Sequence, residues 1–290
     1  MSLSQAYCLD ASQKESFIDN GYLKLPKAIS TLLLEQLREA VDTMTAMGNQ
    51  LPDNALLESS NKQFVVAIDK IVANSNPIFA ELLGSPLLLS IAASLCGDDF
   101  FPVQDFIVIK TLGDQNEVKW HQDVVTKAHE KTFMIGFYLD AATDANGALR
   151  IIPGSHKSNL SICDLQKMEY QSLEMEAGDV LIHNLKIAHS SGELTSFAQR
   201  RVVYFEFMSS TEILQEHIYP QSFVDLRIRL IPNAILCFQQ KYPEVLPFHW
   251  NHPQKDNYQT DANPIAAINE IYKEPKKVKA ANYCFDFTTF

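Results

Sequence analysis

The feature that most constrains the fold of this chain is a series of short apolar segments between residues 105 and 209. Five segments are rich in β-branched and aromatic residues: DFIVIKTL (105–112), TFMIGFYLD (132–140), ALRIIPG (148–154), GDVLIHN (178–184) and RRVVYFEFMS (200–209). Gly, Asn and Asp residues separate them, as they do in strands joined by turns. Short alternating strands of this kind predict an antiparallel sandwich or barrel, with one face of each strand on the core.

The region before these segments carries helix signals. Ser30 can cap a helix that starts at residue 31, and Gly48 stands where that helix could stop. A second helix is predicted from Pro86 to Leu95, closed by Gly97. We therefore expect a helix-rich N-terminal part.

The region after residue 210 is mixed. The segment DLRIRLIPNAILCFQQKY could be helical, with a break at Pro232. No internal repeat or linker is evident. The prediction is one domain over residues 1–290, with a helix-rich part over about 1–100, a β-core over about 101–210 and a mixed part over about 211–290.

Charge and cysteine content restrict the possible partners and location. The net charge of -11 disfavours nucleic acid, and no apolar run is long enough to span a membrane. The five cysteines are odd in number and lack a CxxC pair, which predicts free thiols in a reducing compartment. The N-terminal sequence lacks the pattern of a signal peptide. The expected location is the cytoplasm; the sequence carries no signal for an oligomeric state.

The most informative polar cluster is Trp120-His121-Gln122-Asp123. On an extended strand, residues i and i+2 point to the same side, so His121 and Asp123 can reach one metal ion. An HxD pair alone is a weak signal, because short motifs recur by chance.

A second histidine strengthens this signal. His189 follows the strand-like segment GDVLIHN, and could bring a third ligand from a distant strand of the same β-core. Two histidines and one carboxylate are typical of non-haem Fe(II) sites, which keep coordination positions open. The sequence therefore predicts that His121, Asp123 and His189 are the metal ligands and the catalytic centre. We interpret the neighbouring His183 as a residue behind these ligands or on the surface.

Two adjacent arginines open the last strand-like segment. A buried guanidinium can bind a carboxylate through two hydrogen bonds. Neighbours on a strand point to opposite faces, so only one arginine can face the interior; Arg200 is favoured and Arg201 is the alternative. Ser191 lies close enough to His189 to add a hydroxyl to the same carboxylate. Lys110, on an earlier strand, could also reach a co-substrate or could be an ordinary strand residue.

The order and context of these motifs resemble the phytanoyl-CoA dioxygenase family of Fe(II)/2-oxoglutarate oxygenases. The similarity covers most of the chain. FIDNGYLKLPKAIS resembles the N-terminal opening of the family and PLLLSIAASLCGDD its next helix. WHQD resembles the first iron motif, NGALRIIPGSHK the central turn and strand, and GDVLIHNLKIAHSSG followed by RR the second iron motif.

The resemblance implies a mainly β fold with flanking helices and a double-stranded β-helix (jelly-roll, cupin-like) core. It implies an enzyme that uses Fe(II), 2-oxoglutarate and O₂, with metal ligands at His121, Asp123 and His189. It places 2-oxoglutarate binding on Arg200, with Ser191 beside it. The expected reaction hydroxylates a small molecule, such as an acyl thioester, an amino acid or a natural-product intermediate, and releases succinate and CO₂. Halogenating relatives lack the carboxylate, so Asp123 favours hydroxylation.

One position departs from the family pattern. Some members carry an aromatic residue where this chain has Gly136, so either the site is roomier here or another residue fills the space. The aromatic residues Tyr204, Phe205 and Phe207 are predicted to be core residues, on grounds of strand alternation.

Substrate contacts are expected from loops at the mouth of the barrel. The candidates are residues 49–62, residues 124–131 and the C-terminal segment, which contains FHWNHPQKDNY (248–258). Two other functions stay open. One is a 2-oxoglutarate-independent cupin-type metalloenzyme, such as a zinc hydrolase. The other is a non-catalytic small-molecule-binding module on the same fold.

Overall fold

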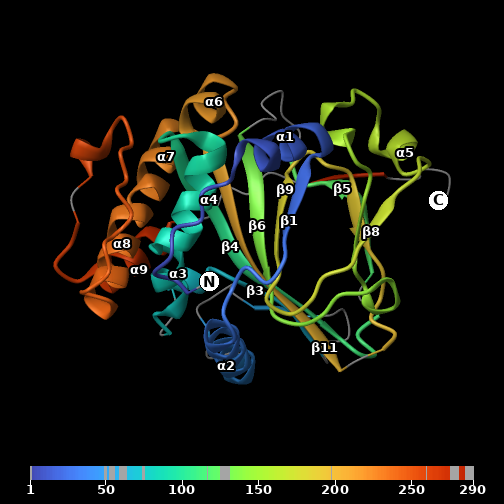
Figure 1. Ribbon diagram of the computed structural model, residues 1–290, viewed down its shortest axis with the longest axis horizontal. Helices are drawn as coiled ribbons and strands as arrows, with labels where there is room; N and C mark the ends of the chain where they lie inside the picture. Colours follow the sequence, from blue (N-terminus) through green and yellow to red (C-terminus); the bar gives the residue numbers. More distant parts are fainter. Residues whose placement is uncertain are drawn as a thin grey trace.

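The computed structural model describes the chain except at a few segments. The described residues are 2–48, 51, 56–58, 64–73, 76–115, 117–124, 131–196, 198–258, 260–274 and 281–284. Two antiparallel sheets face each other, and helices cover the outer face of the larger one (Figure 1). The predicted mainly β, jelly-roll class with flanking helices is confirmed.

The larger sheet has the strand order β1-β9-β6-β11-β4-β3-β2. Its longest pairing joins β11 to β4 from Gln199↔Thr111 to Ser209↔Phe100, and all of its pairs are antiparallel. The strands are β1 (Tyr22–Leu25), β2 (Leu56–Glu58), β3 (Val65–Asp69), β4 (Phe100–Thr111), β6 (Thr132–Tyr138), β9 (Val180–Asn184) and β11 (Gln199–Ser209).

The smaller sheet has the order β12-β5-β10-β7-β8 and is also antiparallel. Its strands are short, so it offers less surface for packing than the larger sheet. They are β5 (Val118–Gln122), β7 (Leu149–Ile151), β8 (Gln171–Leu173), β10 (His189–Ser191) and β12 (Asn282–Tyr283).

Helices α3, α4 and α6 to α9 lie together on the outer side of the larger sheet (Figure 1). The α-helices are α1 (Ala11–Asn20), α2 (Thr31–Met47), α3 (Ile78–Leu83), α4 (Pro86–Cys96), α5 (Ile162–Leu165), α6 (Ser210–Gln215), α7 (Gln221–Ile228), α8 (Leu230–Lys241) and α9 (Pro264–Lys273). The 3₁₀ turns are η2 (Ile71–Ala73), η3 (Asp144–Asn146), η4 (Ser155–Lys157) and η5 (Lys255–Asn257). Among the described residues, none of the helices combines the length and apolarity that a membrane crossing requires.

The predicted helix boundaries follow from capping chemistry. The Ser30 side chain accepts a hydrogen bond from the Leu33 N–H at the start of α2. The Ser85 side chain, just before Pro86, likewise accepts one from a backbone N–H in the first turn of α4. At the end of α1, Gly21 takes the left-handed conformation (φ 80°), which glycine adopts without a steric cost.

The N-terminal part is helix-rich, and it also contributes β1, β2 and β3 to the larger sheet. One detail of the predicted organisation was wrong. The helical break in the C-terminal region falls at Arg229, between α7 and α8, rather than at Pro232. Pro232 lies in the first turn of α8, where a missing N–H breaks no helical hydrogen bond.

The prediction of free thiols was wrong for two of the five cysteines. Cys163 and Cys284 form a disulfide, with their Cα atoms 4.9 Å apart. Cys8, Cys96 and Cys237 are free. An odd number of cysteines leaves at least one thiol unpaired, but it does not exclude a disulfide between two of the others. Here one free thiol is exposed and two are buried.

Candidate active site

The predicted metal ligands come from two adjacent strands of the smaller sheet. His121 on β5 and His189 on β10 are direct partners in the antiparallel register. Asp123 follows β5, and its N–H donates to the Leu185 carbonyl at 2.9 Å. The side chain just before His121 behaves as strand alternation predicts: Trp120 packs on a separate small apolar cluster that includes Ile152.

The three side chains converge on one point. One ligand atom from each of His121, Asp123 and His189 lies within 4.8 Å of the others. The Nε2 atoms of His121 and His189 are 3.3 Å and 3.8 Å from Asp123 Oδ1. Each Nδ1 lies beside a backbone carbonyl, that of Lys119 at 2.8 Å and that of Ile187 at 3.0 Å. With Nδ1–H donating to these carbonyls, the lone pairs of both Nε2 atoms face the common point.

The charge states of the cluster suit a cation. Burial opposes ionisation of Asp123, but His189 and His121 outweigh it and hold its pKa well below the usual range. Burial and the neighbouring His121 lower the pKa of His189 to about 3, so its imidazole is neutral at physiological pH. Burial disfavours the charged form of His121, yet Asp123 outweighs burial and raises its pKa. The cluster therefore holds an ionised carboxylate beside a neutral imidazole, the states that bind a metal.

His183 is a further member of this cluster that sequence analysis placed only loosely. It is buried on β9, and its Nε2 lies 3.6 Å from Asp123 Oδ2. Its ring is 5.3 Å from that of His189. Neither of its ring nitrogens, nor Asp123 Oδ2, has a hydrogen-bond partner among the described residues. Such orphaned polar atoms are costly when buried, and they mark a place where a bound group can satisfy them.

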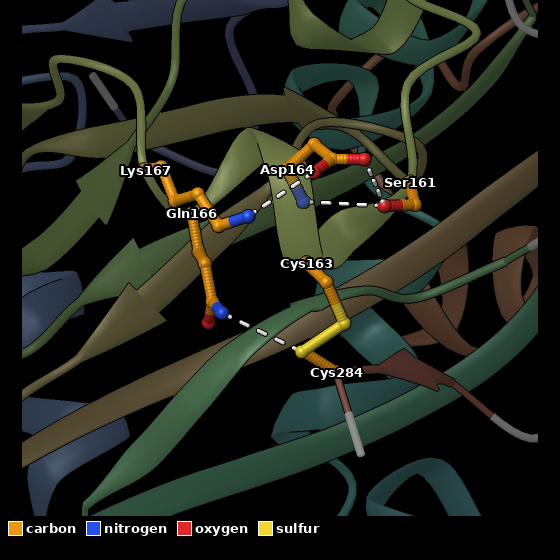
Figure 2. Close-up of a disulfide and its surroundings, with 6 residues drawn as sticks. All are labelled: Ser161, Cys163, Asp164, Gln166, Lys167 and Cys284. Carbon is orange, nitrogen blue, oxygen red and sulfur yellow. Dashed lines mark hydrogen bonds and ion pairs between the residues drawn. A yellow bond between two sulfur atoms is a disulfide. The ribbon is translucent and has the colours of Figure 1, made fainter. Parts of the chain in front are cut away.

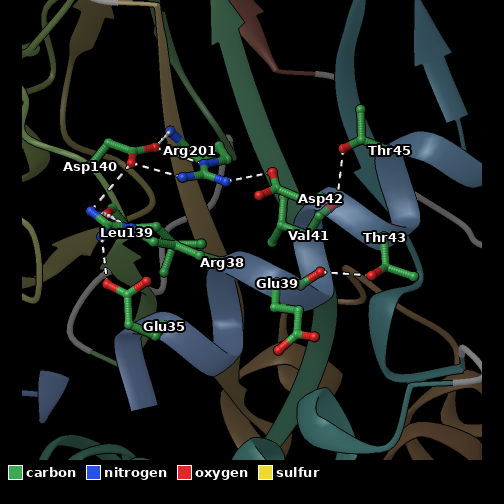
Figure 3. Close-up of polar contacts among 10 residues, drawn as sticks. All are labelled: Glu35, Arg38, Glu39, Val41, Asp42, Thr43, Thr45, Leu139, Asp140 and Arg201. Carbon is green, nitrogen blue, oxygen red and sulfur yellow. Dashed lines mark hydrogen bonds and ion pairs between the residues drawn. The ribbon is translucent and has the colours of Figure 1, made fainter. Parts of the chain in front are cut away.

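The two adjacent arginines point to opposite faces of β11, as predicted. Arg201 points to the helical side, where Nε and Nη2 donate to Asp140 at 2.8 Å and 2.9 Å, and Nη1 donates to Asp42 of α2 at 2.6 Å (Figure 3). Arg38 of α2 adds a second cation to Asp140 at 3.5 Å. These partners tie Arg201 into the scaffold.

Arg200 lies on the opposite, interior face. Its side chain is 2% exposed, and Nη1 donates to the Gly147 carbonyl. The Nε atom has no hydrogen-bond partner among the described residues. The Arg200 side chain therefore keeps a buried donor available to a ligand.

Lys110 is the direct partner of Arg200 in the register of β4 and β11. It is fully buried, and its Nζ donates to the carbonyls of Gly192 at 2.6 Å and Ser191 at 3.4 Å. Burial and the charge of Arg200 lower the pKa of Lys110 to about 7. Ser191 is buried two residues after His189, so the two side chains share one face of β10. The structure thus joins these predicted cofactor-binding residues in one buried basic region.

The space at Gly136 is filled by another residue. A Cβ atom at Gly136 would lie 2.5 Å from Cε1 of Tyr204, so the tyrosine ring occupies the volume that a larger residue would take. Tyr204 stacks on Phe106, with ring centroids 5.2 Å apart, and belongs to the core together with Phe205 and Phe207, as predicted. Burial raises the pKa of Tyr204, and its charge interaction with Arg200 opposes that rise, which places Tyr204 near the basic region.

A cavity of about 390 Å³ opens beside Asp123. Its described lining includes the polar residues Gln104 and Glu206 and is otherwise mainly aromatic and aliphatic. The lining residues are Gln104, Phe106, Asp123, Val124, Met134, Glu206, Met208, Tyr219, Ala281 and Tyr283. The volume falls in the range of small-molecule sites in proteins.

The three segments predicted to contact substrate at the mouth of the barrel differ in where they lie. Residues 125–130 and most of 49–62 lie outside the described part of the chain. The segment 248–258 packs elsewhere, with His252 bonded to Ser210 at 3.2 Å and Trp250 stacked on His252. Among the described C-terminal residues, Ala281 and Tyr283 reach the cavity. They belong to the predicted C-terminal segment, but they could not be singled out from sequence because a strand of two residues has no periodicity to detect.

Comparisons with known proteins show the family of this chain. The family model for phytanoyl-CoA dioxygenase (PhyH) matches residues 17–202. Dioxygenase lolE1 of Epichloe uncinata is 26% identical over 231 residues, which is 74% of this chain and 90% of that protein. Dioxygenase ALT11 of Alternaria alternata is 38% identical over 112 residues, 37% of this chain and only 36% of its own length.

A solved structure shares the fold. That structure is EctD from Sphingopyxis alaskensis with 2-oxoglutarate and 5-hydroxyectoine. It superimposes with a TM-score of 0.63 and 20% identity, covering 70% of this chain and 77% of that one. With the family model matching more than half of its residues, this chain belongs to the phytanoyl-CoA dioxygenase (PhyH) family.

Proposed function

We propose that this chain is an Fe(II)- and 2-oxoglutarate-dependent dioxygenase that hydroxylates a compact small molecule. One observation carries the proposal: residues of both sheets meet in the space between them. His121, Asp123 and His189 come from the smaller sheet, and Arg200 and Lys110 from the larger one. The family membership and the dioxygenase names of the relatives support the same conclusion.

The residues present fit an iron ion. In the proposal, the Nε2 atoms of His121 and His189 and one oxygen of Asp123 hold the metal. The Nδ1 contacts to the Lys119 and Ile187 carbonyls fix the required tautomer of each ring. His183 stays close to the second Asp123 oxygen and can orient it. Bound iron supplies the activation of O₂ and the oxidative decarboxylation of 2-oxoglutarate to succinate and CO₂.

The basic region fits the distal carboxylate of 2-oxoglutarate. Arg200 and Lys110 place two buried cationic groups side by side, and each favours an anion between them. Ser191 adds a hydroxyl on the same side of β10 as His189. A zinc hydrolase or a 2-oxoglutarate-independent enzyme has no use for this anchor, so the basic region favours the oxygenase over both.

The cavity beside Asp123 is the proposed substrate site. A volume of about 390 Å³ holds a compact metabolite, whereas a complete coenzyme A thioester would extend into solvent. Among the substrates considered from sequence, we therefore favour an amino acid or a natural-product intermediate over an acyl thioester. Gln104 and Glu206 supply polar groups on its wall, and Phe106 and Met208 supply apolar surface.

We also propose that residues 1–290 act as one oxygenase domain. One hydrophobic core includes side chains from α2, from both sheets and from α8, which supports a single folding unit. A cytoplasmic location stays a prediction, and the Cys163–Cys284 bridge removes the free-thiol argument that favoured it.

The test is an anaerobic titration of the metal-free protein with Fe(II) and then with 2-oxoglutarate. We expect a weak visible metal-to-ligand charge-transfer band, which is lost in His189→Ala and weakened in Arg200→Ala. The matched control is His249→Ala, an exposed histidine outside the site, which should keep the band. If Fe(II) binds but 2-oxoglutarate gives no band, the chain is another cupin-type metalloprotein. If Fe(II) does not bind, the non-catalytic module is the better account.

A further inference from the structure

The Cys163–Cys284 disulfide joins two segments that are far apart in sequence. Cys163 lies in α5 of the central region, and Cys284 directly follows β12, 121 residues later (Figure 2). Gln166 donates from Nε2 to Cys284 Sγ at 3.4 Å, so both ends of the bridge contact the same short helix. The bridge therefore fixes the position of β12 relative to the smaller sheet.

Strand β12 covers the edge of the sheet at the proposed metal site. It pairs antiparallel with β5, with Asn282 opposite Gln122 and Tyr283 opposite His121. The Asn282 side chain donates from Nδ2 to Gln122 Oε1 at 3.3 Å. In Figure 1 this strand lies beside β5, across the molecule from α9, the helix that precedes it in sequence.

Tyr283 has two contacts that bear on the site. Its ring stacks on the His121 ring, with centroids 4.8 Å apart and an interplanar angle of 15°. It also lines the cavity next to Asp123, where Ala281 of the same segment joins it. One side chain thus packs against a proposed metal ligand and forms part of the wall of the proposed substrate cavity.

A strand of two residues is a weak structural element on its own. Its few backbone hydrogen bonds must offset the loss of conformational entropy when the segment is ordered. A covalent bond one residue away keeps Tyr283 near His121 and so raises its local concentration there. The disulfide is therefore placed to decide how fully Tyr283 occupies its position.

We propose that the Cys163–Cys284 disulfide clamps β12 across the active site and that Tyr283 is a positioning residue for His121. The inference rests on the proposed function, because it takes His121 as a metal ligand. A dithiol reductant opens the clamp. The S–S bond accepts two electrons and two protons, two protein thiols form, and the dithiol becomes a disulfide. Release of β12 frees the His121 ring on one side and opens the cavity wall.

The test begins with the metal-free protein, purified without reductant. Peptide mapping under non-reducing conditions should recover the Cys163–Cys284 bridge. Amide hydrogen exchange across β5 should then become faster in Cys284→Ser and in Tyr283→Ala. Tyr283→Phe keeps the ring and should retain the slow exchange, as should Cys8→Ser, which removes an exposed free thiol. If peptide mapping finds Cys163 and Cys284 as free thiols, or if amide exchange across β5 is equal in all variants, the proposed clamp is wrong.

The second readout is affinity for Mn(II), a metal of the same charge that remains divalent under these conditions. We expect Cys284→Ser and Tyr283→Ala to weaken Mn(II) binding by about tenfold, as loss of a residue that orients a ligand does. Tyr283→Phe and Cys8→Ser should bind like the wild type. If the wild type contains the bridge and Cys284→Ser binds Mn(II) as tightly as the wild type, the bridge does not position Tyr283 for metal binding. Absence of Mn(II) binding in every form defeats the proposed function instead, and the exchange experiment still decides whether the clamp exists.

Discussion

The two sheets of this molecule differ in how they are held and in what they carry. Strands β6, β9 and β11 of the larger sheet are buried along almost their whole length, between the helices and the smaller sheet. The smaller sheet has short strands, and the separate apolar cluster beside it has four buried members among the described residues, Ile152, Ile162, Leu165 and Ala188. The disulfide ties the residue after its edge strand β12 to helix α5. The larger sheet thus provides the framework, and the smaller one is a thin layer that presents the proposed metal ligands.

This division of roles combines a rigid anchor with an accessible metal site. The proposed anchor for 2-oxoglutarate is built on the framework, where Arg200 and Lys110 are held by the long β4–β11 pairing. The proposed metal ligands lie on the smaller sheet, next to the cavity. Substitutions should therefore separate into two groups, one that alters chemistry and one that alters stability.

The largest effect is expected at the metal. Asp123→Gly removes the carboxylate from the smaller sheet, and we expect complete loss of turnover and of tight Fe(II) binding. The side chain is 23% exposed and belongs to no apolar cluster, so the protein should stay folded. Circular dichroism and thermal unfolding of the metal-free protein check the fold. An unfolded variant would mean that the carboxylate is structural.

The reverse pattern is expected for a core residue of the larger sheet. Phe205 is fully buried on β11 and packs edge-to-face on Phe137, with centroids 6.3 Å apart. Phe205→Ala should lower the free energy of unfolding by about 3–5 kcal/mol, because it leaves a cavity in a close-packed core. Denaturant unfolding measures this loss. The protein that remains folded should still bind Fe(II). If the fully folded variant does not bind Fe(II), substitutions that alter stability cannot be separated from those that alter chemistry.

A matched pair of arginine variants compares the two faces of strand β11. Arg200→Ala should weaken 2-oxoglutarate binding by about 2–4 kcal/mol, because the distal carboxylate of 2-oxoglutarate loses a buried cationic partner. Arg201→Ala should spare that binding and destabilise the fold, because Asp42 and Asp140 each lose an ion-pair partner and Asp140 keeps only Arg38. Calorimetric binding and thermal unfolding of both variants give the two readouts. Equal effects of the two variants would mean that the opposite faces of β11 do not define separate roles.

The smallest effect is a pH dependence from Lys110. Its folded pKa of about 7 lies below the usual lysine value, so the unfolded chain binds more protons between the two pKa values. Stability from this group therefore rises as pH increases through that window. An anion beside Lys110 favours the protonated form, so 2-oxoglutarate should bind with proton uptake and weaken by up to about tenfold per pH unit above 7.

Calorimetry of 2-oxoglutarate binding in buffers with different ionisation heats measures this uptake. Lys110→Met should abolish it. An affinity that stays constant from pH 6.5 to 8.5 in the wild type would contradict contact between Lys110 and the carboxylate.

Much of the framework could be predicted from sequence. The cap at Ser30 and the proline at position 86 marked two helix starts, because both signals depend only on neighbouring residues. Strand alternation gave the β-core and the opposite orientations of Arg200 and Arg201, and the family and fold are confirmed. The HxD spacing predicted that His121 and Asp123 share one side, and His189 was added from its place after a second strand-like segment. The three side chains do meet, and their metal-binding role stays a prediction.

The features that were missed depend on contacts between distant segments. Nothing local in the sequence pairs Cys163 with Cys284, because the folded chain brings them together from 121 residues apart. Tyr204 occupies the space above Gly136 through the register of β11 with β6, which a single strand pattern does not reveal. Tyr283 lies on His121 for the same reason.

The proposed site is tested most sharply by an anaerobic crystal structure with Fe(II) and 2-oxoglutarate, with anomalous data at the iron edge. We expect one strong anomalous peak bound by His121, Asp123 and His189, and a 2-oxoglutarate carboxylate in contact with Arg200. An iron peak at other residues, or 2-oxoglutarate bound away from Arg200, would contradict the proposed site.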